Sequence, residues 1–255
     1  MYKGFIIAIS GKGGVGKTDL AALLIRRLSK LGSLLAIDAD ADSNLPKALG
    51  VTVSKTVGEV REAILSAPAR SPIAGDKAGA LRDTLIGVIE EAPEFDIVVM
   101  GRPEGEGCYC PVNYIISEVI DTTGGGYDFT VIDCEAGLEH LSRRTTRDVH
   151  LMIIVTDPTI NSILTAKRVR ELSKELCINF GEVMVVANKV PSEIRSFLDE
   201  AARENDLEIA AYIPYDSALA HLDLLGRPVV NLPHDSPASV AVDEICDSIL
   251  KSQLD

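Results

Sequence analysis

The chain lacks a long hydrophobic run and an excess of basic residues, and we expect no secretory leader. None of its apolar stretches reaches the roughly 18–20 residues that a membrane-spanning helix requires. The apolar run that follows Gly4 is too short for a signal peptide. The net charge of −13 disfavours general binding to nucleic acid or to an anionic membrane. We therefore expect a cytoplasmic protein whose partners include neither nucleic acid nor membrane.

The chain also lacks a disulfide pattern. An odd number of cysteines in a chain without a leader is not typical of a disulfide framework. Cys177 and Cys246 fall within apolar helical patterns, and Cys134 follows an apolar run, so these three are expected to be packing thiols. Cys108 and Cys110 lie in a segment rich in glycine and acidic residues, and they remain as candidate metal ligands.

Short apolar runs alternate with helical patterns along the whole chain. Runs that are apolar on both faces suit a parallel sheet covered on both sides. The expected strands are Phe5–Ile9, Leu34–Ile37, Ile97–Met100, Phe129–Ile132, Leu151–Val155, Val183–Ala187 and Glu208–Ala211. The expected helices are Lys17–Leu31, Thr56–Ser66, Gly79–Glu91, Val112–Asp121, Thr159–Leu176, Ser192–Asn205 and Ser236–Ile249. The pattern predicts an α/β fold: one domain over residues 1–255, with a doubly wound, mostly parallel sheet of about seven to eight strands and helices on both faces.

A glycine-rich run connects the first expected strand to the first expected helix. Its residues are Gly11, Lys12, Gly13, Gly14, Val15, Gly16, Lys17 and Thr18. The glycines allow backbone N–H groups to turn inward around an anion, and the helix N-terminus adds partial positive charge. In this arrangement Lys17 would reach the β- and γ-phosphates, and the Thr18 hydroxyl would ligate Mg²⁺. The run predicts a P-loop ATP hydrolase that binds ATP or ADP with Mg²⁺.

The same glycines allow a competing interpretation. Gly11, Gly13 and Gly16 also fit the dinucleotide-binding fingerprint, and Asp38 ends the next strand about 20 residues on. Lys17 and Thr18 have no role in holding the pyrophosphate of NAD, but a triphosphate with magnesium requires both. Asp133 ends a later apolar strand, as does a Walker B aspartate, which holds magnesium through water. These features favour ATP.

Three alternating carboxylates follow the second expected strand, at Asp38, Asp40 and Asp42. One could orient the attacking water, and another could hold the water shell of magnesium. Alternatively, they form a polar loop in which Asp42 or Ser43 is the N-cap of the next helix. We favour function for Asp38 and Asp40, while the role of Asp42 stays open.

Lys12 is unusual, because an ordinary P-loop needs no lysine at this position. The run from Lys12 to Thr18 resembles the deviant Walker A motif of the dimerising ATPases related to nitrogenase iron protein, MinD/ParA and the arsenite-pump ATPase. The resemblance implies an ATP-dependent homodimer in which Lys12 reaches the partner's phosphates and assists hydrolysis, as an arginine finger does. It also implies a catalytic role for Lys17, a water-positioning role for Asp40, and a place for Asp38 and Asp133 beside magnesium.

The resemblance extends to the side of the site that would hold adenine. Asn188 and Lys189 match the family's adenine-reading asparagine and its neighbour, and Pro214 with Asp216 matches the later adenine-side loop. Asp19 departs from the family pattern, which usually has a second hydroxyl residue after Thr18. Its acidic side chain is expected to weaken nucleotide binding slightly unless it faces away.

Cys108 and Cys110 are two residues apart in the run from Gly107 to Pro111. In an extended segment such residues point the same way, so both thiolates could bind one soft or borderline metal ion. Two ligands rarely complete a site, and a nearby two-fold axis would supply a second pair from the partner. The spacing therefore predicts a four-cysteine site shared between protomers. Two semi-exposed loop thiols are the open alternative.

The combination of this cysteine pair, the deviant P-loop and the run from Asp133 to His140 resembles the CooC family of nickel-insertion ATPases. That resemblance implies Ni²⁺ or Zn²⁺ on Cys108 and Cys110, and a carbon monoxide dehydrogenase or acetyl-CoA synthase complex as client. Glu135 and His140 are not assigned to the metal. The alternatives are an iron–sulfur reductase or scaffold ATPase related to nitrogenase iron protein, and a MinD/ParA-type spatial regulator.

Overall fold

The computed structural model has one central sheet, and it describes residues 4–65, 87–102, 126–135, 149–175 and 180–252. Within these residues eight strands lie in the order β3-β4-β2-β5-β1-β6-β7-β8. Their bounds are β1 Phe5–Gly11, β2 Leu34–Ala39, β3 Glu90–Glu91, β4 Asp96–Val99, β5 Phe129–Cys134, β6 Val149–Thr156, β7 Phe180–Ala187 and β8 Ile209–Tyr212. Only the short edge strand β3 runs antiparallel to its neighbour, so the predicted doubly wound, mostly parallel sheet is confirmed.

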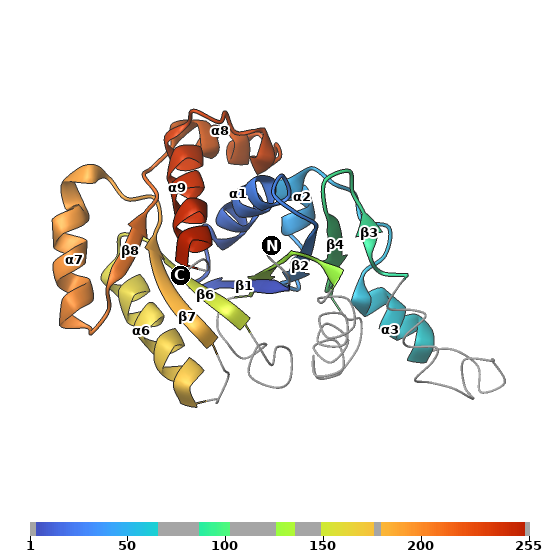
Figure 1. The fold of residues 1–255 in the computed structure, drawn as a ribbon, viewed down its shortest axis with the longest axis horizontal. Coiled ribbons are helices and arrows are strands. Elements are labelled where there is room, and N and C mark those ends of the chain that lie inside the picture. Colours follow the sequence, from blue (N-terminus) through green and yellow to red (C-terminus); the bar gives the residue numbers. More distant parts are fainter. Residues whose placement is uncertain (1–3, 66–86, 103–125, 136–148, 176–179, 253–255) are drawn as a thin grey trace.

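Helices cover both faces of the sheet (Figure 1). Their bounds are α1 Lys17–Leu28, α2 Leu45–Leu49, α3 Val57–Leu65, α6 Ile160–Glu175, α7 Arg195–Glu204, α8 Ser217–Leu224 and α9 Pro237–Ser252, with short 3-10 turns η3 Ser192–Ile194 and η4 Val229–Asn231. Alternate residues of β1 enter opposite cores: Phe5, Ile7 and Ile9 pack with α1, α2 and α9, whereas Ile6 and Ala8 pack with residues of α3, α6 and α7. Burial on both faces explains the unbroken apolar runs.

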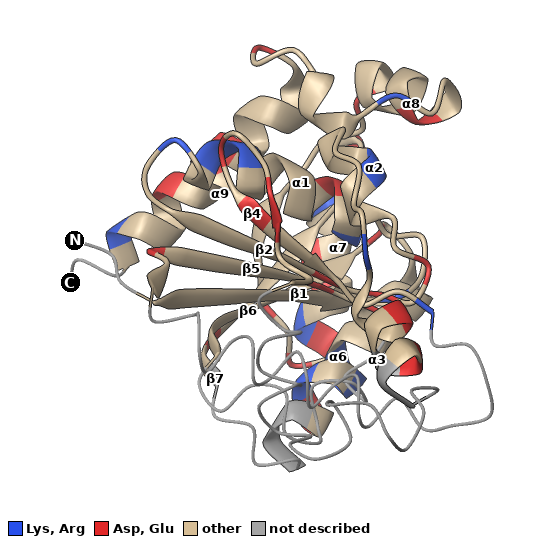
Figure 2. Cartoon of the chain, turned by 90° about the vertical axis from the view of Figure 1, so that its right-hand side faces the viewer, with Lys and Arg blue, Asp and Glu red and all other residues tan. Residues whose placement is uncertain are grey.

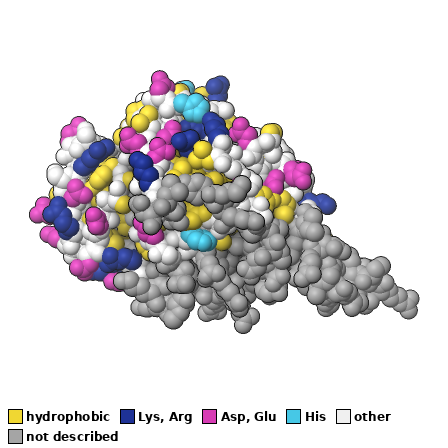
Figure 3. Space-filling model, in the orientation of Figure 1, with side chains coloured by type: hydrophobic (Ala, Val, Ile, Leu, Met, Phe, Trp, Pro, Cys, Tyr) yellow, Lys and Arg dark blue, Asp and Glu magenta, His cyan; other side chains and the backbone are white. Residues whose placement is uncertain are grey.

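The parallel arrangement places several polar residues at one edge of the sheet. Gly11 ends β1, and Asp38 of β2 is level with Asp133 of β5 in the strand register. Because parallel strands end at the same edge, loops that are distant in sequence meet there. Figure 2 shows the central strands almost entirely in tan, with charged residues on the helices and at strand ends. The described part of the face in Figure 3 has acidic and basic side chains side by side.

The helices of the structure differ from the predicted ones at several points, and the five-residue helix α2 is not among the predictions. Glu90 and Glu91, the predicted end of a helix, form β3 instead, because Pro93 lies in a turn that returns the chain to pair with β4. Helix α8 was not predicted; Asp216 is its N-cap, but eight residues are too few to display a helical period. The first helix ends at Leu28 and not at Leu31. The helix expected at 112–121 lies outside the described residues. No helix in the described part of the chain has the length and apolar character needed to cross a membrane.

Candidate nucleotide-binding site

The loop between β1 and α1 has a backbone that only glycine permits at its two ends. Gly11 has φ +151°, and a Cβ atom there would lie 2.3 Å from the carbonyl oxygen of Val155 in the adjacent strand. Gly16, the N-cap of α1, has φ +90°, and its Cβ would lie 2.3 Å from Nδ2 of Asn188. These two glycines bring the loop close to β6 and to the end of β7. The free N–H groups at the start of α1 then face the same opening, as an anion site requires.

The two lysines of this loop lie in different environments. Lys17 is 8% exposed, lines the cavity beside the loop, and donates a hydrogen bond from Nζ to the carbonyl oxygen of Lys12 at 3.3 Å. Lys12 is exposed, and it is absent from the described residues that line this cavity. Lys17 is therefore positioned to contact a phosphate in its own chain, whereas the Lys12 side chain is open to solvent.

Thr18 and Asp133 form the part of the site that fits magnesium. The Thr18 hydroxyl donates to Oδ2 of Asp133 at 2.7 Å. Asp133 is 1% exposed, and its Oδ1 has no hydrogen-bond partner among the described residues. A buried carboxylate oxygen without a partner is costly, and a hydrated cation would satisfy it. Thr18 would then contact the ion directly, and Asp133 would accept hydrogen bonds from its water shell.

Asp38 lies beside Asp133 on the adjacent strand and is fully buried. Its Oδ1 accepts from the N–H of Asp40 at 3.1 Å, and its Oδ2 accepts from the N–H of Leu45 at 3.0 Å. Burial, followed by repulsion from Asp133, raises the pKa of Asp38 to about 7. Burial likewise raises the pKa of Asp133 to about 6, although Thr18 and Lys17 oppose the rise. Two adjacent buried carboxylates with raised pKa values are a site that a divalent cation would stabilise.

Asp40 and Asp42 both line the cavity. Oδ1 of Asp40 accepts from the N–H of Asp42 at 2.9 Å, and Asp42 forms a 3.1 Å ion pair with Arg102, the third residue after β4. The alternative in which Asp42 or Ser43 caps the next helix is wrong: Asn44 is the N-cap of α2. Ser43 has φ +51°, a left-handed conformation in which it cannot act as an ordinary N-cap.

The cavity beside the loop has a volume of about 500 Å³. Its lining includes Lys17, Thr18 and Asp40 together with Asp19, Lys189, Asp223 and Arg227. Burial raises the pKa of Asp19; Lys189 opposes that rise and Asp223 adds to it. A cavity of this size, with a phosphate loop and a cation site on one wall, suits a nucleotide.

Comparison with known proteins assigns the family. A model of the CobQ/CobB/MinD/ParA nucleotide binding domain matches residues 6–229. The chain belongs to this family. An uncharacterized ATP-binding protein of Methanocaldococcus jannaschii is 46% identical over 97% of this chain and 99% of its own length. Carbon monoxide dehydrogenase accessory protein CooC of Rhodospirillum rubrum is 32% identical over 91% and 90%.

Solved structures agree with this assignment. The septum site-determining protein MinD of Pyrococcus horikoshii, complexed with Mg-ADP, is 26% identical and has a TM-score of 0.69 over 96% of this chain and 95% of that chain. The MinD chain of a MinC:MinD complex from Aquifex aeolicus, at 23% identity and a TM-score of 0.70, shares the fold. The protein is therefore a P-loop ATPase of the MinD/ParA type, for which the dinucleotide alternative is wrong.

The residues predicted to contact adenine lie in two places in this ATPase. Asn188 and Lys189 lie beside the phosphate loop, and Pro214 and Asp216 lie near α9. Asn188 is 2% exposed; its Nδ2 donates to the carbonyl oxygen of Val15 at 2.8 Å, and its Oδ1 accepts from the N–H of Lys189 at 2.9 Å. Its amide therefore braces the phosphate loop. Nζ of Lys189 also reaches this loop, at 3.3 Å from the carbonyl oxygen of Gly14. Adenine contacts by these residues stay predictions.

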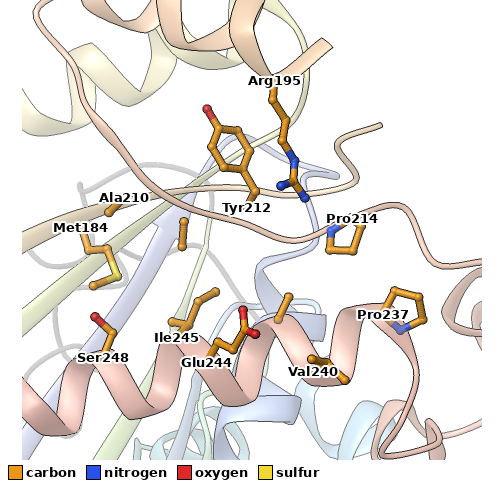
Figure 4. A pocket seen from close by; sticks show the side chains of 12 residues that line it. Met184, Arg195, Ala210, Tyr212, Pro214, Pro237, Val240, Glu244, Ile245 and Ser248 are labelled. Atoms are coloured by element: carbon orange, nitrogen blue, oxygen red, sulfur yellow. The ribbon is translucent and has the colours of Figure 1, made fainter. Parts of the chain in front are cut away.

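Asp216 joins two helices. Its Oδ1 accepts from the N–H groups of Ala218 and Leu219 at the start of α8, and its Oδ2 accepts from that of Ala238 in α9 at 3.0 Å. Burial alone would raise the pKa of Asp216, but these hydrogen bonds outweigh it and hold the pKa below its usual value. Pro214 lines a second cavity of about 500 Å³ between β8 and α9, with Arg195, Tyr212 and Glu244 (Figure 4).

Several cavity residues are not predicted by the sequence patterns. Lys47 of α2, and Asp223, Gly226 and Arg227 at the end of α8, line the cavity but belong to no motif. A local signal existed only at Gly226, whose φ of +62° ends α8 and suits glycine.

The structure tests the predictions for only two of the five cysteines. Cys134 and Cys246 are buried, as expected of packing thiols, and burial raises the pKa of both. Cys108, Cys110 and Cys177 lie outside the described residues, as does His140. Within the described ranges, no group of three or more His, Cys, Asp or Glu side chains is arranged to hold a metal ion. The shared four-cysteine site stays a prediction.

Proposed function

We propose that this ATPase is a metallochaperone of the CooC type. In this proposal an ATP-dependent homodimer carries Ni²⁺, or Zn²⁺ in its resting form, on Cys108 and Cys110. It delivers nickel to a carbon monoxide dehydrogenase or acetyl-CoA synthase complex. Nickel is the cargo of the reaction, whereas Mg²⁺ belongs to the ATPase site.

The observation that carries the proposal is the different exposure of the two loop lysines. Lys17 is buried against its own cavity, and Lys12 is exposed outside it. An exposed lysine beside a phosphate loop is available to a second nucleotide site. If two copies met at this edge of the sheet, each Lys12 would add positive charge to its partner's phosphates, where charge develops during phosphoryl transfer.

The cargo assignment rests on the cysteine pair and on the CooC relative, which aligns with about nine-tenths of each chain. Non-covalent contacts also join the carboxylate loop of the nucleotide site to the segment that precedes the cysteines in the sequence. Cys108 follows Arg102 by six residues, and Arg102 pairs with Asp42 in the loop that contains Asp38 and Asp40. The N–H of Met100 donates to the carbonyl oxygen of Asp38 at 2.8 Å. A change in this carboxylate loop would therefore reach the chain that leads to the cysteines.

An iron–sulfur carrier is the second candidate. A protein named iron-sulfur cluster carrier protein from Methanocaldococcus jannaschii is 28% identical over 96% of this chain and 83% of its own length. Thiolate pairs bind iron–sulfur clusters as well as nickel. Visible absorption of anaerobically reconstituted protein distinguishes the two, because a cluster gives charge-transfer bands that a nickel or zinc site with the same cysteines does not reproduce.

Metal binding tests the cargo. Purified protein and a Cys108→Ala/Cys110→Ala double variant are dialysed against Ni²⁺ and analysed for bound metal, with and without Mg-ATP. We expect the double variant to lose nickel and to keep its affinity for ADP. Cys246→Ala is the matched control, because this thiol of α9 is buried in the core, and we expect the variant to retain nickel. Unchanged nickel stoichiometry in the double variant would remove the cargo from the proposal.

Dimer formation tests the ATPase cycle separately. Lys12→Ala is expected to abolish the ATP-dependent increase in mass measured by light scattering, while Mg-ADP still binds to each protomer. Lys30→Ala is the control, since this exposed lysine follows the opposite end of α1. A Lys12→Ala protein that dimerises with ATP as before contradicts the role in the partner's site.

A further inference from the structure

Asp19 places a negative charge at the phosphate end of α1, where the proposed cycle has no use for it. It is the acidic residue of the first turn, in a helix whose N-cap is Gly16 and has no side-chain cap. Its Oδ2 lies 3.2 Å from the position that a Cβ atom on Gly16 would occupy. The carboxylate therefore points back toward the phosphate loop and lies beside Gly16.

The backbone around Asp19 is the part of the site that binds anions. The N–H groups of Lys17, Thr18 and Asp19 belong to the first turn of α1, whose donors have no partner within the helix. Because Asp19 is itself in this turn and lines the same cavity, a phosphate held by these donors would lie within a few ångströms of its carboxylate. At such separations, like charges near a protein surface repel by an amount that corresponds to roughly tenfold or more in a binding constant.

The opposing charge comes from Lys189. Asp19 and Lys189 line the same cavity, and the electrostatic influence of Lys189 on Asp19 is attractive, whereas that of Asp223 is repulsive. Lys189 has φ +60°, an uncommon conformation for a lysine, and its Nζ is held at 3.3 Å from the carbonyl oxygen of Gly14. One anion and one cation thus line the cavity beside the phosphate loop, Asp19 near Gly16 and Lys189 near Gly14.

Asp19 lies where its charge would act on both ATP and ADP. Thr18 and Asp133 form the part of the site that fits magnesium. Asp19 lies close to the loop at Gly16, beside Asn188, and its charge adds to the rise in the pKa of Asp133. ATP and ADP share the two phosphates nearest the nucleoside, so a negative charge in the first turn of α1 acts on both nucleotides.

We propose that Asp19 is an affinity-setting residue that weakens the binding of ATP and ADP alike, and that Lys189 offsets it. The consequence is faster release of ADP after each turnover, because weaker binding at one site is expressed mainly in the dissociation rate. This inference depends on the ATPase site alone, so it holds or fails independently of the cysteines and of the metal cargo.

An ordinary structural role makes a different prediction. An aspartate in the first helical turn stabilises a helix through the helix dipole, and its removal costs about 0.3–1 kcal/mol. Under that role, Asp19→Asn would lower stability and leave nucleotide affinity unchanged. Under the proposal, the same substitution tightens nucleotide binding whatever it does to stability.

Calorimetric titration of the full chain with ADP, with ATP at 4 °C and with adenosine decides between them. Asp19→Asn keeps the size of the side chain and removes its charge. We expect ADP and ATP to bind roughly tenfold more tightly than to the unmodified protein, and this gain to diminish at high salt. Adenosine has no phosphate, so its affinity is expected to be unchanged.

Asp206→Asn is the matched control for total charge. The Asp206 side chain is 84% exposed and follows α7, away from the cavity lining. Its removal is expected to leave all three affinities as they are. Unchanged or weaker ADP binding in Asp19→Asn overturns the proposal, and so does an equal gain for adenosine, which would point to a contact with the nucleoside.

A second pair of variants tests the balance with Lys189. Lys189→Met is expected to weaken ADP binding roughly tenfold, and Asp19→Asn/Lys189→Met is expected to bind ADP about as well as the unmodified protein. A double variant as weak as Lys189→Met alone contradicts the balance of charges. Urea unfolding of each variant shows whether it is folded before its affinity is interpreted.

Discussion

Asp133→Asn is expected to stabilise the metal-free protein while it damages the site. Asp133 has a pKa of about 6 in the folded protein, against an ordinary 3.8, so its ionised form is less stable in the folded protein than in the unfolded chain. At about 1.4 kcal/mol per pH unit, this gap corresponds to about 3 kcal/mol of instability at pH 8. The pKa of about 6 already includes the opposing hydrogen bond from Thr18, and an amide oxygen still accepts that bond. The expected gain is therefore about 3 kcal/mol at pH 8.

The pH dependence gives this prediction its sign. Asp133 has a raised pKa when folded, so its cost is absent only below about pH 3, where both the folded and the unfolded states are protonated. The cost grows as the pH rises from the unfolded pKa of 3.8 toward 6 and is complete above about pH 7. Urea denaturation in EDTA should therefore show a gain for Asp133→Asn at pH 8, a smaller gain at pH 5, and none near pH 3. The same gain at every pH, or no gain at pH 8, refutes the electrostatic reasoning.

Magnesium should reverse the order of stabilities. The buried Oδ1 of Asp133 has no partner among the described residues, and in the unmodified protein Mg-ADP would satisfy it through the water shell of the ion. We expect Mg-ADP to raise the melting temperature of the unmodified protein and to have little effect on Asp133→Asn. Equal stabilisation of both proteins by Mg-ADP contradicts the assignment of Asp133 to the magnesium site.

Three further substitutions test other contacts. Gly16→Ala should abolish detectable ADP binding in calorimetry and lower the melting temperature, because a Cβ at φ +90° would lie 2.3 Å from Asn188 Nδ2. Normal ADP affinity in this variant would contradict the predicted clash. Arg26→Met should lower the free energy of unfolding in urea by about 2–4 kcal/mol, because Arg26 is 9% exposed and donates to the carbonyl oxygens of Val230 and Leu232 and to Ser239. A loss under about 1 kcal/mol would show that these acceptors find other partners. Arg102→Ala should change stability by less than about 0.5 kcal/mol in the same assay, because its ion pair with Asp42 is exposed, and a larger loss would reveal further contacts.

Local sequence was sufficient for the strands and for the phosphate loop. Buried parallel strands read as continuous apolar runs because both faces are covered, and all seven expected strands are present. The loop was recognisable because its glycines, Lys17 and Thr18 are adjacent in the chain. Strand β3 and helix α8 were missed because one is made by a pairing with β4 and the other is too short for a periodic pattern.

Tertiary structure decided which neighbours the recognised residues have. The order of parallel strands places Asp38 beside Asp133, although 95 residues separate them, and their shared burial raises both pKa values. Asn188 and Asp216 occur in motifs that predict contacts with adenine, and the fold adds contacts that the motifs do not show: Asn188 braces the phosphate loop, and Asp216 accepts hydrogen bonds from two helices.

The sequence by itself therefore determined the chemistry of the phosphate loop, because adjacent residues carry it. Only the fold could assign partners to Asp19 and separate the environments of Lys12 and Lys17. Those properties depend on burial and on distances between segments remote in the chain, which local sequence patterns do not encode.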